Sequence, residues 1–558
     1  MYKTNIVRMY KYSTLRPRAE AGPWGVKGMS NFDWDRLSKG NVSRRGMLKG
    51  AAAIGGAVML GGLALPRMAR AEPTRGGTLT MGLGGANTTD TLDPALAWDD
   101  FMMALSYGGL RNNLVELDAD GNAVGELAES WESSTDAKTW IFRLRKGVEF
   151  HNGKSLDVND VVASINHHRG EKTTSLAKSI FSQIADVKIE DAGSVRIELA
   201  AGNADLAILL SDYHVGIMPA NADGSVNWQS GMGTGGYKLE NFEPGVRATA
   251  TRFANYWKQG RAHADAVELI AINDVTARQS ALVTGQINVM NRVDLKTIAL
   301  LQRAGKVRVD EVQGYCHATM PMLVDVKPYD DKNVRMALKY AIDREQWVAT
   351  LLQGHGVVGN DHPIPANQRY FNSELPQRAY DPDKAKHYLK QAGLDNLSVE
   401  LSASDAAFAT AVDAAVVFKE SAAAAGIDIN VKREPSDGYW SNVWAKKPFC
   451  TCYWTGRPTP DAIFSLIYAK GASFGDTRWD NERFNGLLVE ARAELDETKR
   501  KDMYGEMQTI LSDDGGTIVP MFMNYVNGLG EAVQTPERQS ADLPLDGMKA
   551  IERWWVTA

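Results

Sequence analysis

Cysteine is scarce in this 558-residue chain, which contains only Cys316, Cys450 and Cys452. Three thiols cannot all pair with one another, so we expect no disulfide framework. Cys450-Thr451-Cys452 lacks the second cysteine pair that a zinc or redox centre would need. We therefore favour the interpretation that these two thiols are small apolar groups packed on a buried strand.

Several enzyme and metal-site motifs are also missing. The chain has no H-E-x-x-H, Walker or EF-hand pattern. His167 and His168 are adjacent on an expected helix, so they point roughly 100° apart rather than at one metal ion. The stretch 231–236 contains G-x-G-x-x-G, but a strand pattern follows it instead of the helix that a dinucleotide site requires. It indicates a tight turn.

One nucleophile motif is present, because Gly471-Ala472-Ser473-Phe474-Gly475 matches G-x-S-x-G. The fold that uses this motif needs a histidine base later in the chain, and the last histidine is His387. A secreted serine hydrolase acting through Ser473 therefore stays only as an alternative. We predict no catalytic residues, no enzyme activity, no cofactor and no resident metal.

Positive charge is concentrated at the N-terminus. Residues 72–558 contain 49 basic and 65 acidic residues. A body this acidic repels phosphate backbones, so nucleic acid is excluded as a partner.

The first 71 residues have the pattern of an export segment. Arg44-Arg45 precede fifteen small or apolar residues, 51–65, and Ala69-Arg70-Ala71 follows as a cleavage pattern. This resembles a twin-arginine signal, with Met29 as a second possible start. The apolar run would span roughly 22 Å as a helix, which is short of a bilayer core of about 30 Å. No cysteine directly follows this run at the cleavage pattern, where a lipid would be attached. We therefore expect a soluble, periplasmic protein without a lipid anchor, beginning near Glu72.

The body alternates strand and helix patterns, and 558 residues exceed the roughly 250 to 300 that one core accommodates. Strands are predicted at 77–81 and 139–144, and a hairpin at 187–199. Helices are predicted to start at Asp157, Asp343 and Asp381. Two further helices are predicted from an apolar face running from Phe484 to Leu495 and a second one at 503–511, before a strand at 518–522. The fold class is α/β with several lobes.

A series of short segments in this order resembles family 5 of the solute-binding proteins of ABC importers, which includes dipeptide, oligopeptide and nickel-chelate binders. The segments are Thr91-Leu92-Asp93-Pro94, Leu127-Ala128-Glu129-Ser130-Trp131, residues 142–153 (FRLRKGVEFHNG), Gly233-Thr234-Gly235-Gly236-Tyr237, Asn255-Tyr256-Trp257, residues 334–344 (VRMALKYAIDR) and Tyr380-Asp381-Pro382-Asp383-Lys384-Ala385.

The resemblance implies a periplasmic binding protein type II-like fold, with two α/β lobes joined by a hinge and an inserted extra domain. Lobe I would comprise 72–110, 230–312 and 525–558, the inserted domain II 111–229, and lobe III 313–524. The expected function is capture of a peptide, or another peptide-like small molecule, in the interlobe cleft, which closes around the solute. The expected partners are an ABC permease of the inner membrane and, during export, the twin-arginine translocase; the protein is expected to be a monomer.

The expected ligand-binding residues also come from the resemblance, position by position. Tyr453, Trp454, Thr455, Gly456 and Arg457 match the family's W-x-x-D segment, in which the aspartate holds the ammonium group of a peptide. Arg457 replaces that aspartate, and a guanidinium suits a carboxylate rather than an ammonium group. Alternatively, Arg457 forms an interlobe ion pair and contacts no solute.

Three more positions complete the predicted site. Asp461 could hold Arg457 or take over the amine, and Trp98 could stack on the solute or pack in the core. His317 is a weaker candidate. If His317 and Arg457 converged on a chelator's carboxylates, a metal-chelate or haem binder of the same family would be favoured.

Overall fold

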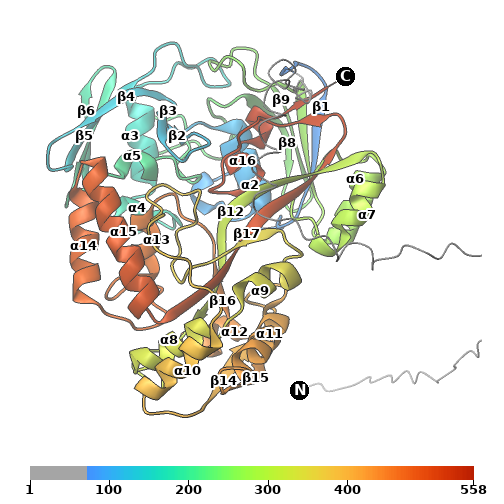
Figure 1. The fold of residues 1–558 in the computed structure, drawn as a ribbon. Coiled ribbons are helices and arrows are strands. Elements are labelled where there is room, and N and C mark those ends of the chain that lie inside the picture. Colours follow the sequence, from blue (N-terminus) through green and yellow to red (C-terminus); the bar gives the residue numbers. More distant parts are fainter. Residues whose placement is uncertain (1–71, 558) are drawn as a thin grey trace, which may run out of the picture. The chain divides into compact units, whose positions relative to one another are not determined.

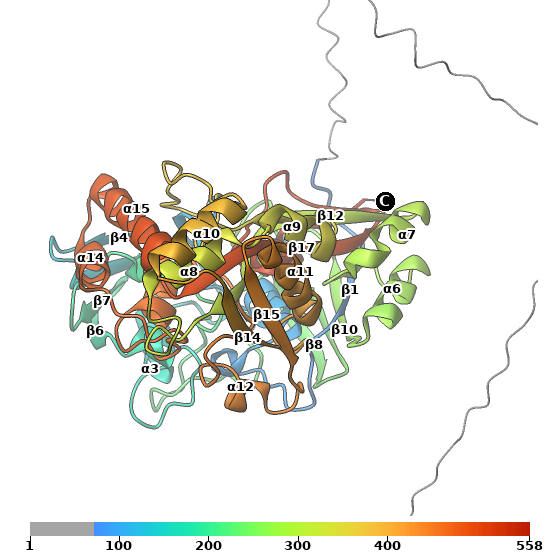
Figure 2. The same ribbon diagram turned by 60° about the horizontal axis from the view of Figure 1, so that its bottom comes forward.

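The computed structural model describes residues 72–557, with every side chain except that of Ser179. The export segment predicted for residues 1–71 lies outside the described residues. The described residues 72–557 form one compact unit (Figures 1 and 2). Within its described part, no helix is both long enough and apolar enough to cross a membrane.

A nine-stranded mixed sheet is the largest element of this unit. Its strand order is β16-β12-β17-β11-β1-β10-β9-β8, and β13 pairs separately with β17. Strand β1 is parallel to β10 and β11, whereas the other pairs are antiparallel. The strands are β1 (Thr78–Leu83), β8 (Tyr237–Glu243), β9 (Arg247–Arg252), β10 (Ala266–Ala271), β11 (Val289–Met290), β12 (Val307–Pro321), β13 (Gly356–Val358), β16 (Cys452–Trp454) and β17 (Thr517–Gly530).

The long strands β12 and β17 connect two separate hydrophobic cores. Val307 and Val526 pack in a core with α6 (Val275–Val283) and α7 (Ile298–Arg303). Met320 and Met521, further along the same two strands, belong to a different core. Pairing of the strands is irregular between Gln313 and His317, so the regular ladder is interrupted between the two cores.

The second of these cores lies beneath a parallel pair of strands. Figure 2 shows β14 and β15 with α11 beside them. Asp343 and Asp381 accept hydrogen bonds from backbone N–H groups in the first turns of α9 and α10, so both predicted helix starts are confirmed. The elements are α8 (Lys332–Tyr340), α9 (Arg344–Leu351), α10 (Pro382–Gln391), β14 (Leu397–Ala403), α11 (Ala411–Ala423), β15 (Ile427–Arg433) and α12 (Tyr439–Asn442).

A four-stranded antiparallel sheet, ordered β4-β5-β7-β6, covers another core. The predicted hairpin is confirmed as β6 and β7, and Asp157 caps α3 with a reciprocal hydrogen bond to Asp160. The elements of this part are β2 (Val115–Leu117), β3 (Ala123–Gly125), β4 (Ala128–Ser133), β5 (Thr139–Leu144), α3 (Val158–His167), α4 (Lys178–Phe181), β6 (Ile184–Asp191), β7 (Ser194–Leu199) and α5 (Leu206–Leu209).

The helices before β17 differ from the prediction at one boundary. The apolar pattern extends to Leu495, but α14 ends at Ala493 and Leu495 is exposed. The reason is local: the side chain of Asp496 caps the next helix, which requires extended backbone just before it. The elements here are α13 (Pro460–Ile463), η5 (Phe464–Tyr468), α14 (Glu482–Ala493) and α15 (Glu497–Asp514).

The two ends of the described chain pack in one core. Leu79 and Met81 of β1 share it with Ile551 and Trp554. The glycine-rich stretch before β8 also packs closely here, since a Cβ on Gly235 would lie 2.3 Å from the carbonyl oxygen of Gly109. The remaining elements are η2 (Pro94–Leu96), α2 (Asp100–Leu105), η3 (Ser106–Leu110), η4 (Leu295–Thr297), β18 (Val533–Gln534), α16 (Pro544–Gly547), α17 (Ala550–Arg553) and β19 (Trp555–Val556).

Candidate functional site

The predicted segment 453–457 begins on an edge strand. Tyr453 and Trp454 of β16 pair with Ala318 and His317 of β12, and β16 ends the order of the nine-stranded sheet. Gly456 allows the chain to stay close to β12, because a Cβ there would lie 2.3 Å from the Cβ of Tyr315. The segment is therefore held against β12 while one side of β16 has no sheet neighbour within the described chain.

Arg457 is half-buried and has spare hydrogen-bonding capacity. Its Nη1 donates to the carbonyl oxygens of Thr455 (3.2 Å) and Gly456 (2.9 Å) and to the Thr455 hydroxyl (2.8 Å). None of the ion pairs in residues 72–557 includes Arg457, and no hydrogen bond there uses its Nε or Nη2. Burial lowers the pKa of this guanidinium, an effect that Tyr213 and Asp212 oppose. Two donor groups of a charged fork thus remain for a further acceptor.

A second guanidinium lies near the Cys316 thiol. Burial raises the pKa of this thiol to about 12, and the charges of Arg292 and Arg457 both oppose that rise. Both guanidiniums are therefore close enough to act on Cys316, although they are 165 positions apart in the sequence. Arg292 already forms an ion pair with Asp100 at 2.8 Å, so Arg457 is the one of the two without a carboxylate partner among the described residues.

His317 is fully buried on β12, with its ring centroid 5.3 Å from that of Phe522. Its Nδ1 lies 3.1 Å from the carbonyl oxygen of Tyr315, and its Nε2 has no hydrogen-bond partner among the described residues. Burial lowers the pKa of His317 to about 4, and the nearby charge of Arg457 acts in the same direction. The histidine is thus neutral at pH 7. It lies on β12, near enough to Arg457 for that charge to act on it.

Asp461 lies at the start of α13, away from Arg457's hydrogen bonds. It is buried and forms an ion pair with Arg492, whose Nη2 is 3.0 Å from Oδ1. Ser465 also donates to it at 3.4 Å. This partnership satisfies the carboxylate within the protein.

Trp98 is not a core residue, since its side chain is 60% exposed. It lines a cavity of about 470 Å³ with Leu96, Met102 and Leu176, beside Asp90. Burial and the neighbouring Asp90 raise the pKa of Asp99, which precedes α2, to about 6. The largest part of this wall is apolar, as expected for a surface that contacts a solute group.

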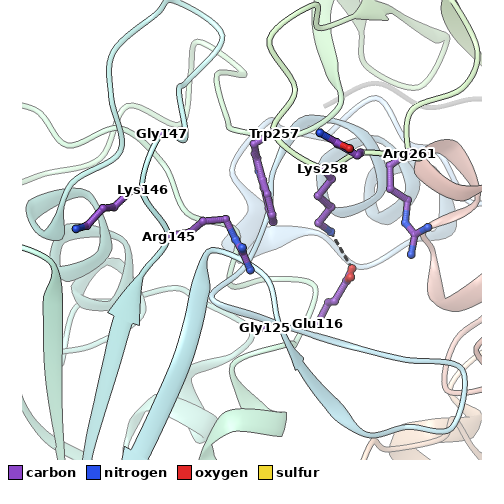
Figure 3. A pocket seen from close by; sticks show the side chains of 9 residues that line it. Glu116, Gly125, Arg145, Lys146, Gly147, Trp257, Lys258 and Arg261 are labelled. Carbon is purple, nitrogen blue, oxygen red and sulfur yellow. Dashed lines mark hydrogen bonds and ion pairs between the residues drawn. The ribbon is translucent and has the colours of Figure 1, made fainter.

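A second cavity, of about 600 Å³, contains none of the predicted site residues (Figure 3). Arg145 lies over the ring of Trp257 at 4.9 Å, and Lys258 forms an ion pair with Glu116 at 2.9 Å, drawn as a dashed line. Lys258 also pairs with Glu126 and Glu552.

The oxygens of Glu116, Glu126 and Glu552 are close enough to hold a metal ion. Lys258 already supplies a positive charge to all three carboxylates. Although burial works against ionisation, Lys258 and Lys549 lower the pKa of Glu552. The arrangement is that of a buried charge network that connects β2 to α17.

The rejected motifs have structural explanations within the described chain. All three cysteines are free, and Cys450 and Cys452 are buried. Ser473 is exposed and has no hydrogen bond to a described histidine. His167 contacts the carboxylate of Asp93 and His168 the hydroxyl of Ser175, so the two imidazoles have different partners.

The two longest strands of the sheet connect separate cores, and the edge strand β16 leads to a guanidinium with unused donor groups. The sequence profile described as "Bacterial extracellular solute-binding proteins, family 5 Middle" matches residues 122–475. The chain belongs to this family.

Characterised relatives cover most of the chain. The dipeptide-binding protein of Escherichia coli (strain K12) is 27% identical over 453 residues, which are 74% of this chain and 83% of that protein. The heme-binding protein A of Haemophilus influenzae is 26% identical over 464 residues, 75% and 82% of the two chains. The glutathione-binding protein GsiB of Salmonella choleraesuis is 25% identical over 442 residues, 76% and 85% of the two chains.

Solved structures confirm the predicted fold class. HbpA2 from Haemophilus parasuis matches with a TM-score of 0.75 and 22% identity, over 86% of this chain and 100% of that chain. CtaP from Listeria monocytogenes matches with a TM-score of 0.74 and 20% identity, over 87% of this chain and 100% of that chain. The fold is thus the α/β fold of type II periplasmic binding proteins.

Sequence reasoning did not identify Arg292 or the aromatic residues that surround Tyr453 and Trp454. Arg292 follows a two-residue strand and belongs to no motif. The aromatic residues did leave a signal, because Trp440, Trp444 and Phe474 lie within 35 positions of one another on either side of the motif.

Proposed function

We propose that this protein is the periplasmic substrate-binding component of an ABC importer, and that it captures peptides or peptide-like solutes with a free carboxylate. Family membership and the dipeptide- and glutathione-binding relatives support this proposal. The protein would be exported by the twin-arginine translocase, remain free of a lipid anchor, act as a monomer and deliver its solute to an inner-membrane permease.

The single observation that carries the carboxylate preference is the state of Arg457. A half-buried guanidinium with two unused donor groups, at the position where the family motif has an acid, favours an anionic group. Arg292 is also near, although Asp100 already balances its charge. An ammonium group placed at Arg457 would be repelled by its guanidinium.

The edge position of β16 supports a peptide-like backbone in the solute. An edge strand presents unpaired N–H and C=O groups, which an extended peptide can use as if it were an added strand. The remaining polar groups of the solute would be satisfied directly or through trapped water. Binding leaves the solute chemically intact, so the protein is not an enzyme. Incubation with a serine-directed phosphonate should accordingly leave Ser473 unlabelled.

Calorimetry with two matched dipeptides tests the proposal. N-acetyl-dialanine has a free carboxylate and no amine, whereas dialaninamide has a free amine and no carboxylate. The purified protein should bind N-acetyl-dialanine more tightly, and Arg457→Gln should remove the difference. Equal affinities, or tighter binding of dialaninamide, would overturn the carboxylate preference.

The alternative is a metal chelate or haem, as named for one relative. The proximity of Arg457 to His317 is the observation in its favour. Mass spectrometry of small molecules released from the gently denatured native protein distinguishes the two. A chelate would be recognised by the mass of its metal complex, and haem by the mass of its porphyrin.

A further inference from the structure

Five aromatic side chains gather beside the edge strand. Trp440 and Trp444 come from α12 and the turn after it, Tyr453 and Trp454 from β16, and Phe474 from the loop after η5. Successive ring centroids are 6.0 to 6.2 Å apart, from Tyr453 to Trp440, Trp444, Trp454 and Phe474. We call these five residues the aromatic cluster.

Three rings of the aromatic cluster are exposed, whereas Trp444 and Trp454 are half-buried against neighbouring cores. The exposed fractions are 43% for Trp440, 46% for Phe474 and 37% for Tyr453. Isolated exposed apolar side chains are ordinary, but neighbouring large rings that remain exposed together mark a surface that contacts something apolar. Their tilted and edge-on arrangement also leaves ring faces available for stacking.

A buried acid holds the cluster in place. Trp444 donates its indole N–H to Oδ2 of Asp476 at 3.3 Å, and Asp476 is only 2% exposed. The ring of Trp444 is therefore oriented from behind by a polar anchor, so its position does not depend on apolar contact with the other rings alone.

Tyr453 connects the aromatic cluster to the two arginines. Its ring contacts that of Trp440 in the cluster. Burial and Cys316 raise the pKa of its phenol, and the charge of Arg292 opposes that rise. Arg457 follows only four residues later on the same segment. A solute with its carboxylate at Arg457 would thus extend along this segment toward the rings.

We propose that the aromatic cluster is the subsite for a ring of the solute, so that the protein selects peptide-like anions that carry an aromatic or other planar group. This inference rests on the proposed function, because the carboxylate at Arg457 and Arg292 places the solute. The continuity through Tyr453 favours a solute ring over a separate macromolecular partner as the occupant of the cluster.

Three probes separate the two proposals in calorimetry. N-benzoyl-dialanine has a ring and a carboxylate, N-acetyl-dialanine only the carboxylate, and N-benzoyl-dialaninamide only the ring. The benzoyl acid should bind about three- to tenfold more tightly than the acetyl acid, as one aromatic contact allows. Equal affinities for the two acids would overturn the ring subsite and leave the carboxylate site standing.

The neutral benzoyl amide tests the carboxylate proposal. If it binds as tightly as the benzoyl acid, the carboxylate proposal is wrong, whereas the ring subsite stands. If none of the probes binds, both proposals fail. If the rings instead serve a protein partner, the two acids bind alike, which also overturns the inference.

Variants assign the effect to particular rings. Trp440→Ala and Phe474→Ala should each reduce the affinity for the benzoyl acid severalfold and leave that for the acetyl acid within twofold. Trp440→Phe should retain the preference. Leu300→Ala, a control at another exposed apolar side chain on α7, should change neither affinity. Equal loss of both acids in a variant that unfolds at the parent's temperature would contradict a ring-specific role.

Discussion

At the ligand position expected from the family resemblance, this chain has Arg457 where the resemblance implies an aspartate. The energy of two unit charges about 4 Å apart changes by several kcal/mol at an effective dielectric constant of about 20 when one of them reverses sign. As a proposed ligand contact, Arg457 is therefore expected to change which end of a peptide is held, rather than to adjust the affinity slightly.

Arg457→Asp should convert the site to one that prefers free-amine dipeptides over N-acetylated ones, because the carboxylate would pair with an ammonium group. Calorimetry with dialaninamide and N-acetyl-dialanine measures the change. Arg457→Lys, which keeps the charge but lacks the planar fork, should retain the parent's order of preference with lower affinity. An unchanged preference in Arg457→Asp would show that this side chain contacts no solute.

Asp476 predicts a pH dependence of stability. Burial raises its pKa from 3.8 to about 7, so the folded protein binds a proton more strongly than the unfolded chain does. This group's contribution to the free energy of unfolding is fully present below about pH 4, where the unfolded chain is protonated too. The contribution, on the order of a few kcal/mol, is lost as the pH rises to about 7. Asp476→Asn should remove this component.

Thermal unfolding of the parent and of Asp476→Asn between pH 5 and pH 8 measures the effect. The parent should lose more stability than the variant over this range, since other groups titrate equally in both. Ser473→Ala, a nearby exposed change, is the control and should follow the parent. Parallel curves for parent and Asp476→Asn would contradict a protonated Asp476.

At the scale of elements, the site depends on how closely the segment after β16 approaches β12. The contact is fixed by Gly456, whose added Cβ would meet the Tyr315 side chain at 2.3 Å. Moving the segment would displace Arg457 along with it, because its Nη1 is bound to the carbonyl oxygens of Thr455 and Gly456.

Gly456→Ala should destabilise the protein by about 1 to 3 kcal/mol and weaken solute binding, as overpacking of a close contact does. Urea unfolding and calorimetry measure the two effects. Gly486→Ala is the matched control: this glycine lies inside α14 with no atom near an added Cβ, so alanine should stabilise by about 0.5 to 1 kcal/mol. A neutral Gly456→Ala would show that the segment can shift freely.

At the scale of the whole molecule, β12 and β17 connect cores that would have to move relative to each other during closure. The division into lobes I, II and III and the hinge remain predictions from the family resemblance. The irregular pairing between Gln313 and His317 is where we expect the strands to bend, because fewer ladder hydrogen bonds resist bending there.

Small-angle X-ray scattering tests closure. Saturating N-acetyl-dialanine should reduce the radius of gyration of the mature protein, since the solute adds contacts only in the closed state. Arg457→Gln at the same probe concentration should remain at the value without solute. A radius unchanged in a parent shown by calorimetry to be saturated would contradict the hinge.

Local features of this protein followed from the sequence by itself. The aspartates at 157, 343 and 381 predicted helix starts correctly, because a cap depends on a side chain and the backbone two or three residues away. The ordered motifs identified the family in the same way. That Arg457 replaces an acid of the family motif remains a prediction from the resemblance.

Only the tertiary structure decided which distant groups come near one another. The charges of Arg292 and Arg457 both act on the Cys316 thiol, and Asp461 pairs with Arg492 instead of Arg457. Trp440, Tyr453 and Phe474 stay exposed although their residue types favour burial. Exposure and charge pairing depend on contacts between segments far apart in sequence, and hydrophobic periodicity within one segment carries no information about them.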